Sequence, residues 1–180
     1  MSRLTGFRTL LISAAVIVAT LTGCASPANR EAMVATGLQL GQTHDASVSV
    51  TTSGGAETSG MEGSFISDAD LKAAIESAIA QNAVFKQVVQ GDGGNYALLV
   101  SVVTLDRPLF GTSFTVNLEA AWTLTKTDDR SIVYRKSLRS SHTATMGDAF
   151  AAVTRLRLAV EGAARKNIEQ GLQEISTLKL

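Results

Sequence analysis

The hydrophobic positions of the chain recur with two periods, one typical of strands and one typical of helices. Residues 113–125 alternate strictly between apolar and mostly polar side chains. Successive side chains of a strand point to opposite faces of a sheet, so this alternation predicts a strand with one buried face. The apolar side chains of this strand are Phe114, Val116, Leu118, Ala120, Trp122 and Leu124.

Weaker alternation predicts further strands over residues 47–51, 85–90 and 96–105. Residues 96–105 are largely apolar on both faces, which favours a central place in the sheet. The glycine-rich turn at 91–95 predicts that the strands on either side of it pair with each other. After a turn at 128–130, a last strand is expected to bury Ile132, Tyr134 and Leu138 and to expose Arg135, Ser137, Arg139 and Ser141.

A period of three to four residues predicts two helices. Ser67 is placed to cap the first helix, with Asp70 completing a short capping box, and Asn82 ends it. The second helix is expected to begin at the cap Asp148 and to run to about Ile175. The expected buried stripes are Leu71, Ala74, Ile75, Ala78 and Ile79 in the first helix, and Phe150, Val153, Leu156, Val160, Ala164, Ile168, Gly171, Leu172 and Ile175 in the second.

Each helix has one apolar stripe, and each stripe has to be buried against an apolar sheet face. The sequence therefore predicts a single α+β domain over residues 45–180. Its sheet is expected to be mainly antiparallel, with four to five strands and both helices packed on one face. The other face is left exposed or turned towards a partner.

The first 23 residues have the pattern of a secretory signal peptide. Arg3 and Arg8 precede an almost wholly apolar run over residues 10–21. A helix of that length spans about 18 Å, which is too short for the roughly 30 Å hydrocarbon core of a bilayer. We therefore exclude residues 1–23 from the folded domain.

The residues that end this segment, Leu21-Thr22-Gly23-Cys24, resemble the bacterial lipobox. The resemblance implies cleavage before Cys24, a diacylglyceryl group on its thiol and usually acylation of the new amino terminus. Several acyl chains anchor a protein durably where a single chain does not. Ala25 follows the cysteine in place of the aspartate that retains lipoproteins at the inner membrane, so the resemblance implies the outer membrane. The alternative is an ordinary signal peptide with a chance cysteine at its cleavage site.

Residues 24–44 are expected to be the lipidated cysteine followed by a tether, because they contain few sustained apolar patterns. Met33, Val34, Leu38 and Leu40 are spaced closely enough to form a short element, so the boundary of the domain is soft.

Charge and composition exclude several functional classes. The chain has 16 basic and 16 acidic residues, and cleavage would remove two basic ones and leave a net charge of −2. A nucleic-acid-binding protein normally carries a basic excess, so that class is disfavoured. The single cysteine leaves no internal disulfide and no cysteine-rich metal site. We expect neither a cofactor nor a metal.

The candidate catalytic groups have simpler structural interpretations. His44 and His142 lack the spacing of metal ligands and are expected to be surface or loop residues. A triad of Ser140 or Ser141 with His142 and Asp148 is disfavoured, because Ser141 and His142 point to opposite strand faces and the sequence has no Gly-x-Ser-x-Gly elbow. The aspartate pairs 68/70 and 128/129 fall in a helix start and a turn. We therefore expect no catalytic residues.

The basic residues of the last strand are the most informative polar feature. Arg135 and Arg139 share one strand face and, with Thr115 and Asn117 on the neighbouring strand, predict a surface for a protein partner or an anionic ligand such as a phosphorylated glycolipid. The alternative is a solvated face whose charges discourage edge pairing.

Residues 71–105 are similar to small outer-membrane lipoproteins with a βαβ…βα domain. The similar segments are Ala-Ile-Glu-Ser-Ala-Ile at 74–79, Val-Phe-Lys-Gln-Val-Val at 84–89 and Asn-Tyr-Ala-Leu-Leu-Val at 95–100. These lipoproteins include auxiliary lipoproteins of envelope transporters, lipopolysaccharide-assembly lipoproteins and lipoproteins with a domain like the amino-terminal one of TolB. The resemblance supports this fold and an envelope location. The lipobox, together with a compact domain that has no catalytic grouping, predicts a non-enzymatic envelope protein that binds a protein or glycolipid partner through the polar sheet face or an edge strand. The alternative function is a membrane-tethered periplasmic enzyme acting on lipid or cell wall.

Overall fold

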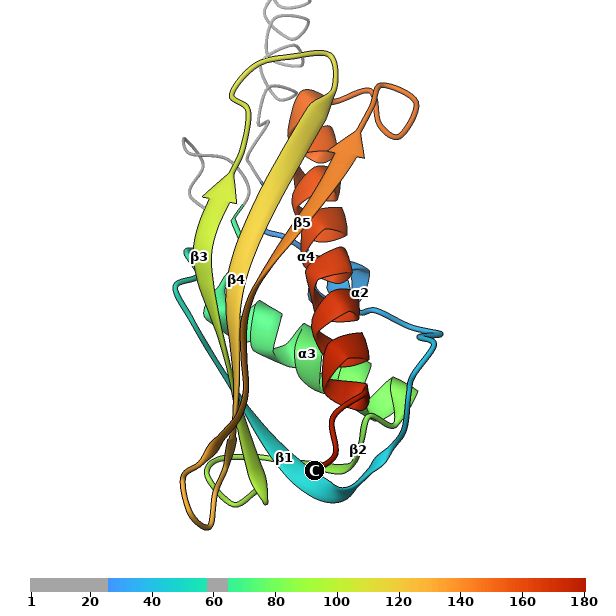
Figure 1. Cartoon of the computed structure of the whole chain (residues 1–180). Helices are drawn as coiled ribbons and strands as arrows, with labels where there is room; N and C mark the ends of the chain where they lie inside the picture. The colour runs from blue at the N-terminus through green and yellow to red at the C-terminus, as the bar shows by residue number, and fades with distance from the viewer. Residues whose placement is uncertain (1–25, 58–64) are drawn as a thin grey trace, which may run out of the picture.

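One layer of the molecule is a five-stranded sheet, and helices form the layer beside it (Figure 1). The computed structural model describes residues 26–57 and 65–180. The elements are α2 (Arg30–Met33), β1 (His44–Ser53), α3 (Asp68–Asn82), β2 (Phe85–Val89), β3 (Tyr96–Asp106), β4 (Phe114–Lys126), β5 (Ile132–Ala144) and α4 (Ala152–Ser176).

The sheet has the strand order β2-β1-β3-β4-β5. Strand β1 is parallel to β2 and β3, while the longer pairings of β4 with β3 and with β5 are antiparallel. Helices α3 and α4 lie on the same face, with α3 crossing behind α4 (Figure 1). The predicted α+β fold, mostly antiparallel with two long helices on one face, is confirmed.

The predicted hairpin of β2 and β3 is wrong, because β1 lies between them. β2 pairs with the first half of β1, and β3 pairs with the second half. The end of β2 and the start of β3 therefore lie on either side of the middle of β1, and residues 90–95 cross over β1 to connect them. Gly94 makes this crossing, and a Cβ there would lie 2.8 Å from the backbone nitrogen of Ser49. Glycine is favoured both in hairpin turns and where two backbones cross closely. The glycine-rich composition of residues 91–95 therefore could not distinguish a hairpin turn from a crossing over β1.

The first predicted helix is confirmed from its cap to its last residue. The Ser67 hydroxyl oxygen accepts the backbone N–H of Asp70 at 3.1 Å and donates to the Asp70 carboxylate at 2.7 Å. All five residues of its predicted stripe are buried. Ala83 ends the helix in a left-handed conformation.

The buried face of β4 is also confirmed, since all six of its predicted apolar side chains are buried. Of the three β5 residues predicted to be buried, Leu138 is buried, Tyr134 is half-buried, and Ile132 is exposed beside the β4–β5 turn. The prediction for Ile132 is wrong because a register shift at Leu124/Thr125 loosens this end of the strand pair.

The last helix begins at Ala152 rather than at Asp148. The Asp148 carboxylate accepts the backbone N–H and the hydroxyl of Thr145 at 2.7 and 2.9 Å, so it closes a loop and does not cap α4. As a result, Phe150 and Val153 are exposed and the predicted stripe begins only at Leu156.

The prediction of a tether over residues 24–44 is wrong for its described part. Met33 is 0% exposed, and Ala28 and Ala35 are also buried in the core. Helix α2 packs against α3 and α4. The sequence left a short element open here but did not specify a helix, because four residues are too few to show a helical period.

The predicted signal peptide and Cys24 lie outside the described residues. Within the described part of the chain, none of the helices combines the length and the apolar character needed to cross a bilayer.

Candidate functional site

The sheet face opposite the helices, which we call the open face, is not covered by any described element (Figure 1). Strand register aligns its side chains in rows across the sheet. One row crosses four strands and consists of Thr51, Leu99, Thr123 and Arg135. The next row is Ser53, Ser101, Ala121 and Ser137.

The two predicted arginines on the open face differ in their surroundings. The Arg139 Nε donates to the Glu119 carboxylate at 2.8 Å. The Ser137 hydroxyl donates to the same carboxylate at 2.6 Å, and these two hydrogen bonds lower the pKa of Glu119. Arg135 lies two rows away, opposite Thr123, and is exposed. The charge of Arg139 is therefore compensated by Glu119.

A groove of about 340 Å³ crosses the open face where β3, β4 and β5 run side by side. It brings Asn117 and Arg139 together, as predicted, but it also contains Asp106 and Glu119. Two carboxylates against one guanidinium disfavour an anionic ligand in this groove.

Thr115 and Arg135 do not join that groove. The Thr115 hydroxyl is 2.8 Å from the hydroxyl of Thr143. Thr115 and Thr123, the partner of Arg135, are separated by about 27 Å of extended strand. The four predicted residues therefore share one face without forming one site.

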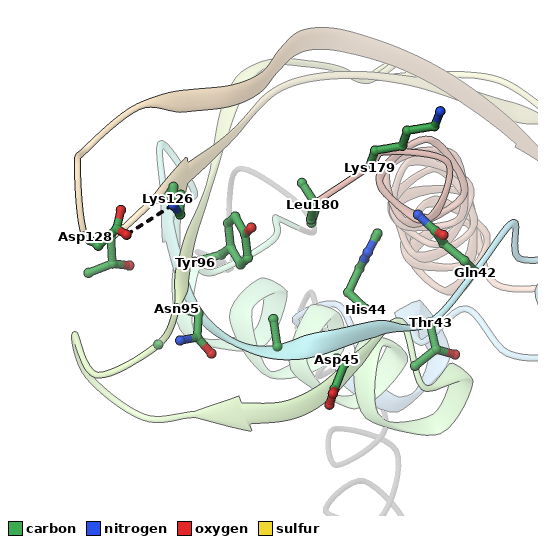
Figure 2. A pocket seen from close by; sticks show the side chains of 13 residues that line it. Gln42, Thr43, His44, Asp45, Asn95, Tyr96, Lys126, Asp128, Lys179 and Leu180 are labelled. Atoms are coloured by element: carbon green, nitrogen blue, oxygen red, sulfur yellow. Dashed lines mark ion pairs between the residues drawn. The ribbon is translucent and has the colours of Figure 1, made fainter.

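A larger cavity of about 730 Å³ lies beside the C-terminal residues, at the end of the sheet where β1 begins (Figure 2). It is lined by four separate segments, which are residues 42–46, 94–96, 126–128 and 179–180. No sequence signal predicted this cavity, because the four segments meet only through the strand order.

Several polar side chains in this cavity already have partners. His44 is 4% exposed, its Nε2 lies 2.9 Å from the carbonyl oxygen of Ile175, and its ring packs against Phe85. Lys126 pairs with Asp128 at 3.1 Å (Figure 2), and Asp45 pairs with Lys86 at 2.7 Å. The cavity therefore offers room for a small ligand, but these groups serve the local structure.

The prediction of a surface or loop position is wrong for His44, which is buried on β1. His142 is half-buried, and its ring packs so closely on α4 that a Cβ at Gly162 would lie 2.0 Å from it. Burial and the charges of Lys166 and Arg165 lower the pKa of His142.

Ser141 and His142 diverge as predicted. Ser141 pairs with Asn117 of the open face, while His142 pairs with buried Val116. The described residues contain no cluster of three or more His, Cys, Asp or Glu side chains able to hold a metal ion.

No protein-family model matches this chain, and no curated protein does. Among solved structures, a DUF330 protein of Xanthomonas campestris aligns with a TM-score of 0.59 at 13% identity, covering 78% of this chain and 89% of its own. A protein of Caulobacter crescentus assigned as a lipoprotein aligns with a TM-score of 0.50 at 19% identity, covering 72% and 88%. The PelC dodecamer of Paraburkholderia phytofirmans gives 0.50 at 12% identity, covering 81% and 96%. At these identities the likeness is one of fold.

Proposed function

We propose that this chain is a non-enzymatic envelope lipoprotein, held at the outer membrane by an acylated Cys24, whose open face binds a protein partner in outer-membrane assembly or transport. The observation that carries the proposal is the uncovered sheet face, since helices α3 and α4 bury the other face of the same sheet. The lipobox at residues 21–24 supports the anchor. A fold neighbour assigned as a lipoprotein agrees with it.

The composition of the open face suits a protein partner. Leu99 and Val103 are exposed near its centre, threonines and serines surround them, and Arg135 lies towards the β5 edge. Protein interfaces likewise combine an apolar core with a polar rim. The two carboxylates of the groove would repel a phosphorylated glycolipid, so we favour a protein over a glycolipid. The PelC neighbour is a dodecamer, which shows a protein of this fold in a larger assembly.

The cavity of Figure 2 supports a second candidate, the binding of a small ligand. Its volume lies in the range of small-molecule sites. An enzyme acting on lipid or cell wall would need an activated nucleophile or a general base there. His44 is the imidazole that lines the cavity, and its Nε2 lies 2.9 Å from the carbonyl oxygen of Ile175.

The anchor is tested with Cys24→Ala in the full-length chain. Mass spectrometry of the wild-type protein is expected to show a mature chain that begins at acylated Cys24, and fractionation is expected to place it in the outer membrane. Cys24→Ala is expected to leave the membrane fraction. A bare thiol, or unchanged fractionation of the variant, would contradict the anchor.

The open face is tested by copurification from crosslinked envelopes. Leu99→Glu and Arg135→Glu each change an exposed side chain on this face. Gln81→Glu on α3 is the matched control for Leu99→Glu, because it also adds one negative charge at an exposed position away from the open face. We expect the first two variants to lose a partner that the control and wild type retain. Equal recovery by all four proteins would show that the partner binds elsewhere.

A further inference from the structure

Two loops project large apolar side chains into solvent. The β3–β4 loop carries Leu109 and Phe110, and the β5–α4 loop carries Met146 and Phe150. Phe110 is 89% exposed and Phe150 is 88% exposed. Scattered exposed apolar residues are ordinary, but a group of large ones at one place marks an interaction surface. We call these four residues the apolar tip.

The two loops emerge side by side. Phe114, the first residue of β4, pairs with Ala144, the last residue of β5. The β3–β4 loop therefore ends, at residue 113, beside the point where the β5–α4 loop begins, at residue 145. Figure 1 shows both loops at the same end of the sheet, opposite the C-terminus and the β4–β5 turn.

The β5–α4 loop is held by its polar groups, which leaves its apolar side chains outside. Arg155 is buried, and its Nη1 donates to the carbonyl oxygens of Ala149 and Phe150 at 3.0 and 2.6 Å. Asp148 closes the other half of the loop through Thr145. Because these contacts satisfy the backbone, the exposed ring of Phe150 is displayed on an ordered loop.

The described chain begins close to this end of the sheet. The backbone N–H of Ala28 donates to the carbonyl oxygen of Phe65 at 3.3 Å. The guanidinium of Arg107, at the start of the β3–β4 loop, lies 3.7 Å from the centre of the Phe65 ring. Ala28 is thus connected through one residue to the loop that carries Phe110.

The short connection between Cys24 and the domain limits how far the domain stands from its anchor. Ala28 is buried, so only four residue steps separate Cys24 from the folded core. Four extended residues reach at most about 14 Å. An acylated Cys24 therefore holds the neighbouring end of the domain within reach of the bilayer surface.

We infer that the apolar tip faces the membrane and that Phe110 and Phe150 insert into the interfacial region of the bilayer that holds Cys24. This inference rests on the proposed lipidation. Apolar side chains buried at the boundary of headgroups and acyl chains add binding energy to a lipid anchor. The geometry sets the strands upright on the membrane, with the cavity of Figure 2 at the far end.

The test uses the full-length acylated protein reconstituted into phosphatidylethanolamine–phosphatidylglycerol vesicles with brominated acyl chains, which quench tryptophan. Phe110→Trp and Phe150→Trp report on the apolar tip. Ile132→Trp is the matched control, an exposed apolar position at the opposite end of the sheet. The native Trp122 is 0% exposed, so the wild-type signal supplies the background.

We expect loss of emission from the Phe110→Trp and Phe150→Trp variants in brominated vesicles and unchanged emission from Ile132→Trp. If Cys24 carries its acyl groups and both tip variants remain unquenched, this inference is wrong while the proposed anchor stands. Unquenched but blue-shifted emission from the tip variants in native envelopes would assign the apolar tip to a protein partner and also overturn it. A bare Cys24 would overturn both proposals.

Discussion

The carboxylate of Glu161 accepts a hydrogen bond from the backbone N–H of Asn29, with 2.8 Å between the two atoms. Glu161 is 3% exposed on α4, and the Nε of Arg157 lies 3.6 Å from the same oxygen. Burial raises the pKa of Glu161 despite these contacts. This side chain therefore joins the N-terminal segment to α4, the longest of the described helices.

Glu161→Ala is expected to lower the free energy of unfolding by about 0.5–1.5 kcal/mol, because the backbone N–H of Asn29 loses its acceptor. Urea unfolding at one pH measures this loss, and equal stability of the variant and wild type would contradict it.

Glu161→Gln keeps an acceptor and removes the buried charge. The folded-state pKa is raised, so the stability contributed by Glu161 is complete below its ordinary value of 4.5 and is lost as the pH rises through the folded pKa. The free energy of unfolding of Glu161→Gln, measured in urea and compared with that of wild type, should therefore be relatively higher at pH 7 than at pH 4. A constant difference between the two proteins would contradict this linkage.

Gly94→Ala is expected to lower the free energy of unfolding by about 1–3 kcal/mol, because the added Cβ would overpack the crossing of β1. That atom would meet backbone atoms of Tyr96 at 2.7 Å and Ser49 at 2.8 Å. Gly93→Ala is the matched control, since its Cβ would meet nothing within 4 Å. Urea unfolding of both variants checks the prediction, and equal stabilities would show that the crossing tolerates a side chain.

His142 is expected to make the domain less stable as the pH falls. Its pKa is lowered in the folded state, first by burial and then by Lys166 and Arg165. Protonation therefore favours the unfolded chain, and stability declines as the pH drops through the ordinary value of 6.5 towards the lowered one. Thermal unfolding between pH 7.5 and 5 measures this decline. His142→Gln should flatten it, and a slope that survives in the variant would assign it to other groups.

Gly171→Ala is expected to destabilise the domain by about 1–3 kcal/mol, although alanine is the better helix former. The new Cβ would lie 2.7 Å from the ring of buried Trp122, whose indole N–H donates to Asn167 at 2.9 Å. Trp122 is the only tryptophan in the chain, so its fluorescence follows both unfolding and displacement of the ring. Gly147→Ala in the β5–α4 loop is the control, because the atom nearest to its new Cβ would be 3.5 Å away. This variant should leave the stability of the domain and the fluorescence of Trp122 unchanged.

Much of the candidate site followed from strand alternation alone. The alternation placed Arg135, Arg139, Thr115 and Asn117 on one exposed face, as the structure confirms. It did not show that Glu119 compensates Arg139, since that contact depends on the register between β4 and β5. Whether a partner binds this face stays a prediction.

The sequence by itself determined the elements whose signals are local, such as the Ser67 cap, the α3 stripe and the buried face of β4. These signals are sufficient because hydrogen bonds and apolar periodicity within one segment specify its conformation. Only the tertiary structure decided that β1 separates β2 from β3, that Met33 is buried, and that four distant segments enclose the cavity. Such features depend on which segments meet in space, and strand order is settled by the packing of the whole core rather than by any one segment.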